Sequence, residues 1–440
     1  MATALGADVS PARRCAYRVV RRVFEQGAYA DRAMHAESGN LDARERSFAM
    51  ALSYATVQRR ATLDHVIEQL AGRSVGKLEP PVIATLRVGL TQLLLLGGVA
   101  EHAAVDESVK LCKLDAPRAA GLVNAVMRRA TRDGTAIMAA LDDSTPERAA
   151  LLHSIPVWLA RLWFDELGAD QARALLVAVN QPAESALRVN TLVATVAEVR
   201  ARLPVPALPA PGLPYGLVLD GPFDAHGSPL WARGAIMPQS RGSMIPAHVL
   251  APQPGERVLD LCSAPGAKAT QLAALIVDDG AVVCVERNPR RADGLGRTLR
   301  RMHADAASVR VADATEPLDP AWGQFDRVLV DPPCSGLGTL QSRPDIRWRT
   351  SPERIAETAA LQARILQCGA AAVRPGGMIV YSVCTITRRE GPTIVERFLA
   401  DNRDFTPDPF AGCDAGTSHL QLLPHVDGTD GFFIARFRRR

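Results

Sequence analysis

The sequence lacks the cysteine and histidine motifs that hold a metal ion. Its eight cysteines stand at positions 15, 112, 262, 284, 334, 368, 384 and 413, with no Cys-x-x-Cys pair, and no His-x-His occurs among the nine histidines. Neither a zinc site nor a disulfide framework is therefore indicated. We expect reduced thiols and no metal.

Long apolar runs are also missing. The longest, around Leu93 to Leu96, is far shorter than the roughly 20 residues that a membrane-spanning helix needs. The first twenty residues contain Arg13, Arg14 and Arg18 but no apolar segment of the kind found in a secretory signal. These absences predict a cytoplasmic protein without membrane contact, and we expect it to be monomeric.

Lysine is scarce. Only four of the 51 Lys and Arg residues are lysines, namely Lys77, Lys110, Lys113 and Lys268. Because arginine is so common in this chain, a cluster of arginines is weak evidence for a functional site. A lysine within a motif is stronger evidence. The net charge of +4 is small for 440 residues, so it permits an anionic partner without requiring one.

The length predicts two or three domains, and the composition, 47% apolar and 22% charged, is that of an ordinary globular protein. From residue 1 to 145 apolar residues recur at helical spacing and no strand is evident, so we expect an all-α domain. The expected helices are Ala16 to Phe24, Arg46 to Leu70, Val82 to Leu96, Val105 to Leu114 and Gly121 to Arg132.

Residues 146–235 are predicted to form a small α+β connector. Ser144-Thr-Pro-Glu147 is a helix start, with Pro in the first turn of a helical segment that continues to about Asn180. A short strand at Leu187 to Thr191 and a helix at Val196 to Leu203 follow. The proline-rich stretch from Pro204 to Tyr215 cannot lie inside a packed sheet.

Residues 236–440 alternate between strand-like and helical runs. This pattern favours a doubly wound, Rossmann-like α/β domain with a parallel sheet. Near the C-terminus two short strand candidates flank a turn rich in Asp and Gly, which predicts an antiparallel hairpin at the sheet edge. The expected parallel strands are 258–261, 281–286, 308–313, 327–331 and 378–383.

Polar residues follow the predicted strands in series. The loop Asp260-Leu-Cys-Ser-Ala-Pro-Gly-Ala-Lys268 consists of small residues before a helix, so its backbone can approach a ligand closely. Glu286 ends the second strand, where a carboxylate can accept hydrogen bonds from ribose hydroxyls. Asp313 and Asp331 end the third and fourth. Such carboxylates suit a cofactor with ribose, adenine and a positive centre, as in S-adenosylmethionine, and would repel a phosphate.

Two cysteines end neighbouring predicted strands. Cys334 follows Asp331-Pro-Pro, and Cys384 ends the sequence YSVC. A thiolate can add to carbon 6 of cytosine and so activate carbon 5 for methylation, and a second group can remove the proton that must then leave carbon 5. We expect Thr385 or Thr387 to cap the next helix, whose N-terminus would favour a thiolate.

These residues resemble the RNA 5-methylcytosine methyltransferases, in particular the bacterial 16S rRNA branch of the Sun type. RPDIRW at 343–348 and the ending DGTDGFFIARF look like this branch, and GLVNAVMRR at 121–129 is similar to its antitermination-factor-like RNA-binding domain. The resemblance implies that Cys384 is the nucleophile and that Cys334 assists product release. It assigns S-adenosylmethionine binding to Cys262, Ser263, Ala264, Pro265, Gly266, Ala267, Lys268, Glu286, Asp313 and Asp331.

The sequence leaves other interpretations open. The same chemistry may act on tRNA or another RNA instead of 16S rRNA. The Asp-Pro-Pro element also occurs in enzymes that methylate exocyclic amino groups, although an aromatic residue is then expected where Cys334 stands. A non-catalytic RNA-binding assembly or antitermination protein is the third interpretation, against which Lys268, Cys334 and Cys384 all argue.

Overall fold

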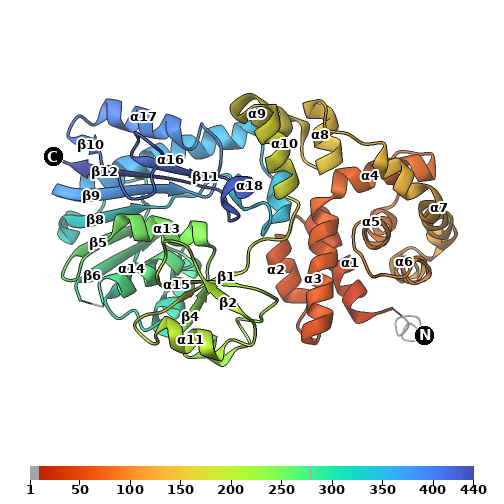
Figure 1. The fold of residues 1–440 in the computed structure, drawn as a ribbon, viewed down its shortest axis with the longest axis horizontal. Coiled ribbons are helices and arrows are strands. Elements are labelled where there is room, and N and C mark those ends of the chain that lie inside the picture. Colours follow the sequence, from red (N-terminus) through yellow and green to blue (C-terminus); the bar gives the residue numbers. More distant parts are fainter. Residues whose placement is uncertain (1–8, 278) are drawn as a thin grey trace. The chain divides into compact units, whose positions relative to one another are not determined.

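The computed structural model describes residues 9–277 and 279–440. The chain divides into two compact units. The helical unit comprises Met1–Gln181 together with Leu340–Arg349, and the sheet unit comprises Pro182–Thr339 together with Thr350–Arg440. The chain therefore leaves the sheet unit after Thr339, contributes ten residues to the helical unit, and returns (Figure 1).

Helices form throughout the N-terminal part, as the periodicity predicts. The first begins at Pro11, where Ser10 Oγ accepts a hydrogen bond from the backbone of Arg13 and proline occupies the first turn. The expected helix from Arg46 to Leu70 is two helices, separated at Arg59. The apolar spacing did not reveal this break, because an interruption of one residue hardly disturbs it. The elements are α1 Pro11–Glu25, α2 Ala30–Glu37, α3 Ala43–Gln58, α4 Arg60–Ala71, η1 Val75–Lys77, α5 Pro80–Leu94, α6 Glu101–Asp115, η2 Pro117–Ala119 and α7 Ala120–Ala139.

Three further helices complete the helical unit: α8 Pro146–His153, α9 Val157–Leu167 and α10 Ala169–Ala178. Helix α8 starts as predicted, with Pro146 in its first turn and the Thr145 hydroxyl accepting from the backbone of Arg148. In the described part of the chain no helix is long and apolar enough to cross a membrane.

Segment 340–349 is anchored in the helical unit by Arg347. The guanidinium is fully buried and donates to the backbone oxygens of Gln58, Ser154 and Val179 and to Asn180 Oδ1, at 2.8 to 3.3 Å. No carboxylate of the described residues pairs with it. Burial, with a smaller contribution from Arg59, lowers the Arg347 pKa to about 9.

The connector forms a four-stranded antiparallel sheet in the order β2-β3-β1-β4. The predicted strand and helix are present, while β3 and β4 were not expected. Proline-containing β2 lies at the edge, as the backbone of proline requires. The elements are β1 Ala186–Val189, α11 Val196–Arg202, β2 Ala207–Pro209, β3 Gly216–Leu219, α12 Pro229–Ala232 and β4 Ile236–Pro238.

The second sheet has eight strands and contains the predicted doubly wound core. Its order is β10-β12-β9-β8-β5-β6-β7, with β11 paired to β12. Strands β5 to β9 run parallel, and the order reverses between β5 and β8, the place where α/β sheets bind ligands. The elements are α13 Arg241–Leu250, β5 Arg257–Leu261, α14 Ala267–Leu275, β6 Ala281–Glu286, α15 Pro289–Arg301, β7 Ala307–Val311, η3 Pro320–Trp322, β8 Phe325–Val330, η4 Leu337–Thr339, η5 Pro344–Trp348, α16 Pro352–Ala372, β9 Val373–Val383, α17 Pro392–Asp401, β10 Phe405–Pro407, β11 His419–Leu422, α18 Pro424–Asp427 and β12 Phe432–Arg439.

The C-terminal hairpin of β11 and β12 is confirmed, and β12 pairs antiparallel with β9. Side chains of the central strands alternate between two apolar cores, one on each face of the sheet. On β8, Val328 and Val330 belong to one core and Leu329 to the other. Covering on both faces explains why consecutive residues such as Val328, Leu329 and Val330 are all apolar.

Replacing Arg347 should destabilise the helical unit. Arg347→Ala leaves its buried oxygen acceptors without a donor, at a cost of about 3 kcal/mol in the free energy of unfolding. The measurement is calorimetry of the full chain, in which the transition of the helical unit should move to lower temperature. Exposed Arg343 in the same segment provides the control, Arg343→Ala. Equal transitions for the two variants would refute the anchoring role.

Candidate functional site

The side chains singled out in the sequence gather at one edge of the eight-stranded sheet. Strands β5, β6, β8 and β9 are parallel, so their carboxyl ends meet at this edge. The register pairs Leu329 of β8 with Asp260 of β5 and with Val380 of β9. Glu286 is the last residue of β6, and the loops that follow β5, β8 and β9 carry Cys262, Asp331, Cys334 and Cys384.

The two predicted reactive thiols lie side by side, with Sγ of Cys334 3.1 Å from Sγ of Cys384. Both cysteines are partly buried. The contact with Cys384 and burial together hold the pKa of the Cys334 thiol well above its ordinary value.

Lys268 and Asp331 form an ion pair beside the thiols. Lys268 Nζ donates to Asp331 Oδ2 at 2.7 Å, and the hydroxyl of Ser382 donates to Asp331 Oδ1 at 2.9 Å. Burial acts to lower the Lys268 pKa, but the attraction and hydrogen bond of Asp331, together with the charges of Cys384 and Asp260, raise it overall. The Lys268 ammonium also lies 5.3 Å from the centre of the Phe432 ring.

A cavity of about 350 Å³ opens at the ends of β5, β6 and β7, and neither Lys268 nor Asp331 lines it. Cys262, Glu286 and Asp313 line it, with apolar walls from Ala312, Ala314, Pro333, Leu361 and Ile365. Glu286 Oε1 accepts from the backbone of Asn288 at 2.8 Å. Asp313 lies two positions beyond β7, which ends at Val311 and not at 313 as expected. The backbone and hydroxyl of Thr315 lower the Asp313 pKa.

The other predicted cofactor residues form the turn from β5 into α14. Ser263, Ala264, Pro265, Gly266 and Ala267 do not line the cavity. The Ser263 backbone donates to Val285 O, and Ala264 O accepts from Arg291. Gly266 has φ +109, a conformation that other residues rarely adopt, which explains glycine at this position.

Two arginines occupy the cavity rim. Arg287 lies 3.5 Å from Asp313, and Arg291 lies 3.4 Å from Glu286. Both arginine side chains are more than half exposed, so these pairs are weak and can exchange with a ligand. The sequence assigned no role to either residue.

Asp260 was named only as the start of the loop, and its environment could not be predicted. It is 1% exposed, and neither carboxylate oxygen accepts a hydrogen bond from a residue that the structure describes. Burial, and secondarily repulsion from Asp331, raises its pKa to about 7.

Glu390 is a functional candidate that the sequence did not reveal. Between the loops of Cys334 and Cys384 it accepts hydrogen bonds from Ser335, Gln362, Thr385 and Thr387. Its position after Arg388 and Arg389 is typical of a surface ion pair, so no pattern indicated burial. The expected helix cap at Thr385 or Thr387 is wrong: α17 begins only at Pro392, and both hydroxyls bind Glu390 instead.

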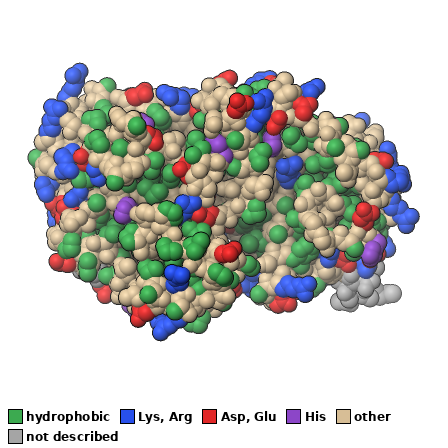
Figure 2. Space-filling view, viewed as in Figure 1, with side chains coloured by type: hydrophobic (Ala, Val, Ile, Leu, Met, Phe, Trp, Pro, Cys, Tyr) green, Lys and Arg blue, Asp and Glu red, His purple; other side chains and the backbone are tan. Residues whose placement is uncertain are grey.

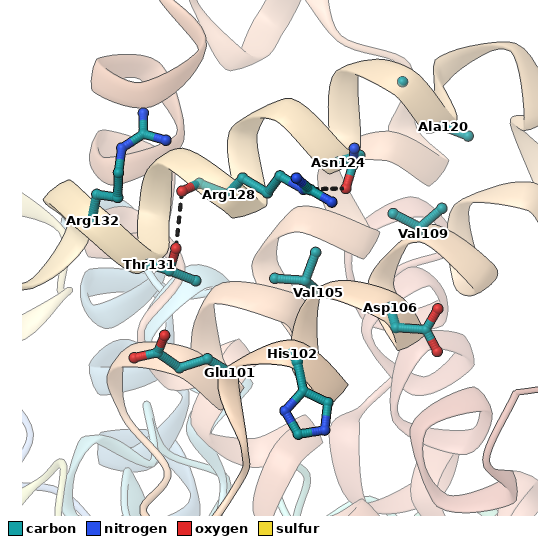
Figure 3. Close-up of a pocket in the computed structure, with 11 residues that line it drawn as sticks. Glu101, His102, Val105, Asp106, Val109, Ala120, Asn124, Arg128, Thr131 and Arg132 are labelled. Carbon is teal, nitrogen blue, oxygen red and sulfur yellow. Dashed lines mark hydrogen bonds between the residues drawn. The ribbon is translucent and has the colours of Figure 1, made fainter.

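The helical unit has a second cavity, of about 810 Å³, between α6 and α7 (Figure 3). Basic Arg128 and Arg132 face it together with acidic Glu101 and Asp106. Arg128 Nε donates to Asn124 Oδ1 at 3.3 Å. Charges of both signs are likewise interspersed over the molecular face drawn in Figure 2. No catalytic arrangement is evident at this cavity.

Comparisons with known proteins agree with this architecture. Residues 247–438 match the family model described as 16S rRNA methyltransferase RsmB/F, residues 155–226 its ferredoxin-like domain, and residues 10–132 the NusB family. These matches and the observed elements confirm the predicted fold class, a helical domain followed by an α+β connector and a doubly wound α/β domain.

Individual relatives match over nearly the whole chain. The probable ribosomal RNA small subunit methyltransferase B of Synechocystis is 34% identical and covers 97% of this chain and 99% of its own. Ribosomal RNA small subunit methyltransferase B of Thermus thermophilus is 37% identical, covering 90% and 89%. The crystal structure of PH0851 is 25% identical with a TM-score of 0.83, covering 98% and 99%.

The Asp260 environment predicts a pH-dependent stability. Because the folded-state pKa of about 7 exceeds the ordinary value of 3.8, the folded protein binds more protons, and stability should fall as pH rises from 4 to 7. Asp260→Asn removes this dependence, so the variant should gain stability relative to the wild type across that window, by on the order of 4 kcal/mol.

Urea unfolding of the sheet unit at a series of pH values measures this difference. Asp305→Asn, at an exposed position of the same unit, serves as the control and should follow the wild type. Parallel pH profiles for Asp260→Asn and the wild type would contradict the raised pKa.

Proposed function

The chain belongs to the 16S rRNA methyltransferase RsmB/F family, and from this premise we propose that it methylates carbon 5 of a cytosine in 16S rRNA through a covalent bond to Cys384. The observation that carries the proposal is the pair of sulfurs 3.1 Å apart beside a cavity rich in carboxylates. Methyl transfer to an exocyclic amino group requires no thiol, whereas methylation at carbon 5 can use both the Cys334 and the Cys384 thiol.

We assign the cofactor S-adenosylmethionine to the cavity at the ends of β5, β6 and β7. When bound, it supplies a methyl group on a positively charged sulfur. Glu286 is the acceptor for ribose hydroxyls, Asp313 the acceptor for the adenine amino group, and Ala312 and Leu361 provide apolar walls for the base. Cys262 to Lys268 form the close turn beneath it. The unpartnered carboxylate of Asp260 fits a cationic ligand, since any positive group nearby would stabilise its charge.

The thiols divide the proposed covalent chemistry. The sulfur of Cys384 bonds to carbon 6 of cytosine, and the electron pair of the ring double bond moves to carbon 5, which becomes nucleophilic and takes the methyl group. A base then removes the proton from carbon 5, the double bond re-forms, and the sulfur leaves. Cys334, once it has released its own proton to solvent and become a thiolate, is placed to accept that proton.

The raised pKa of Cys334 supports this division. Because its raised pKa keeps Cys334 protonated in the free enzyme, Cys334 is the poorer nucleophile of the two, which leaves the attack to Cys384. A thiolate with a high pKa is also a strong base, which suits the later removal of a proton from carbon.

The two cysteine variants should behave in opposite ways. Cys384→Ala removes the nucleophile and should abolish methyl transfer. Cys334→Ala should still permit attack but stall elimination, so that a covalent protein–RNA adduct accumulates. A denaturing gel with labelled RNA measures the adduct, with Cys368→Ala, a cysteine outside the pair, as the control. An adduct formed by Cys384→Ala instead would reverse the assignment.

The substrate and the division of labour along the chain form part of the proposal. Residues 1–145 bind RNA, residues 146–235 connect, and residues 236–440 catalyse, in a cytoplasmic, monomeric enzyme. Each family match falls within one of these segments, which supports the division. Cytosines in loops are the favoured targets, because an unstacked base can enter a pocket.

Sequencing after bisulfite treatment tests the substrate. A strain lacking the gene should show one cytosine of 16S rRNA that becomes converted, while tRNA and 23S rRNA stay as in the parent strain. Restoring the wild-type gene, but not the Cys384→Ala form, should return the protected cytosine. A newly converted cytosine in tRNA alone would replace the proposed substrate.

A further inference from the structure

Glu390 is a buried carboxylate without a cationic partner. Its residue is 0% exposed, and it forms no ion pair with a residue that the structure describes. Hydrogen-bond donors compensate for the missing cation. Oε1 accepts from the Ser335 backbone at 2.8 Å and from Gln362 Nε2 at 3.0 Å. Oε2 accepts from the hydroxyls of Ser335, Thr385 and Thr387 at 2.5, 3.2 and 3.0 Å.

The donors come from both sides of the thiol pair. Ser335 directly follows Cys334, and Thr385 directly follows Cys384, yet both hydroxyls bind the same oxygen atom of Glu390. The two hydroxyl oxygens are themselves 2.8 Å apart. One carboxylate thus joins the loop after β8 to the loop after β9 at the residues next to the sulfurs.

Gln362 of α16 extends this link to the other side of Cys334. Its Nε2 donates both to Glu390 Oε1 and to the backbone oxygen of Pro333, each at 3.0 Å. Cys334 is therefore held through the residue before it and the residue after it. The Gly338 backbone also donates to Cys384 O, a second contact between the loops.

We infer that Glu390 is a positioning residue that fixes the distance and relative orientation of the Cys334 and Cys384 sulfurs for the reaction. This inference rests on the proposed function, in which one sulfur must reach carbon 6 while the other reaches the proton on the adjacent carbon 5. Such a reaction tolerates little displacement, because misplacing a reacting group by about 1 Å can reduce the rate about 100-fold.

The chemistry of the position requires a carboxylate of this length. All its partners are donors, and a carboxylate is the side chain that only accepts. A glutamine would direct its NH2 group at donors on one side. In the position of Oε1 the NH2 group would meet the Ser335 N–H, which cannot accept a hydrogen bond. The NH2 group must therefore take the position of Oε2, where it weakens the hydrogen bonds to the hydroxyls. An aspartate keeps the charge but cannot reach both loops.

The test measures the thiols and the kinetics in Glu390→Gln and Glu390→Asp. Both variants should lower kcat roughly 100-fold, while KM for RNA and the S-adenosylmethionine affinity measured by calorimetry should stay within about 2-fold. Without RNA or cofactor, iodoacetamide alkylation of Cys334 and Cys384, followed by mass spectrometry, should change in rate. Glu256→Gln is the matched control, since Glu256 pairs with Arg327 at the opposite end of the strands.

A double-mutant cycle separates positioning from general loss of stability. Ser335→Ala and Thr385→Val each remove one hydroxyl that donates to Glu390, one from each loop, so each should reproduce part of the defect. Combination of either with Glu390→Gln should add much less than the sum of the single effects. Glu256→Gln, by contrast, should leave kcat and alkylation rates at wild-type values.

The outcomes distinguish the inference from the proposed function. If the wild type forms no 5-methylcytosine, the proposed function is wrong. The alkylation rates still show in that case whether Glu390 positions the two sulfurs. If the wild type is active and Glu390→Gln and Glu390→Asp match it in kcat and alkylation, the inference alone fails. Equal losses of cofactor affinity and kcat, or additive double mutants, would also overturn positioning in favour of a structural role.

Discussion

The site depends on the carboxylate of Asp331, where three parts of the sheet edge are joined. Lys268 lies in the first turn of α14, Asp331 directly follows β8, and Ser382 belongs to β9. Both carboxylate oxygens of Asp331 accept hydrogen bonds, at 2.7 and 2.9 Å. Parallel strands bring these ends together, but only specific hydrogen bonds fix their side chains.

Around that junction the protein combines two kinds of carboxylate. Asp260 lies without a donor among the described residues and resists ionisation, whereas Glu390 is surrounded by donors. Both acids are buried, but only the Glu390 carboxylate has its oxygens bound by hydrogen-bond donors of the described residues. The first arrangement is suited to receive a positively charged ligand, and the second to hold two loops in place.

The features that could be predicted from the sequence are those produced by local periodicity and by strand order. Alternating apolar runs indicated the parallel sheet, and parallel strands necessarily end at one edge, so the convergence of Cys334 and Cys384 was predictable. Glu390 was not, because its burial arises from partners on α16 and the Cys334 loop. The short strands β3 and β4 were missed because three or four residues carry too little pattern. The expected caps at Thr385 and Thr387 failed because a buried carboxylate competed for both hydroxyls.

The excursion of Leu340–Arg349 into the helical unit has a consequence for how this protein can be divided. A fragment that starts after Gln181 would carry the strands, the thiols and the cavity, yet also ten residues whose packing partners are gone. Trp348 Nε1 would lose its acceptor, Val57 O, and the Arg347 guanidinium would be stripped of its buried oxygens. The sheet unit alone would therefore contain a segment that has nothing to pack against. A gene encoding this unit by itself would need a redesigned stretch just beyond the Asp-Pro-Pro-Cys turn.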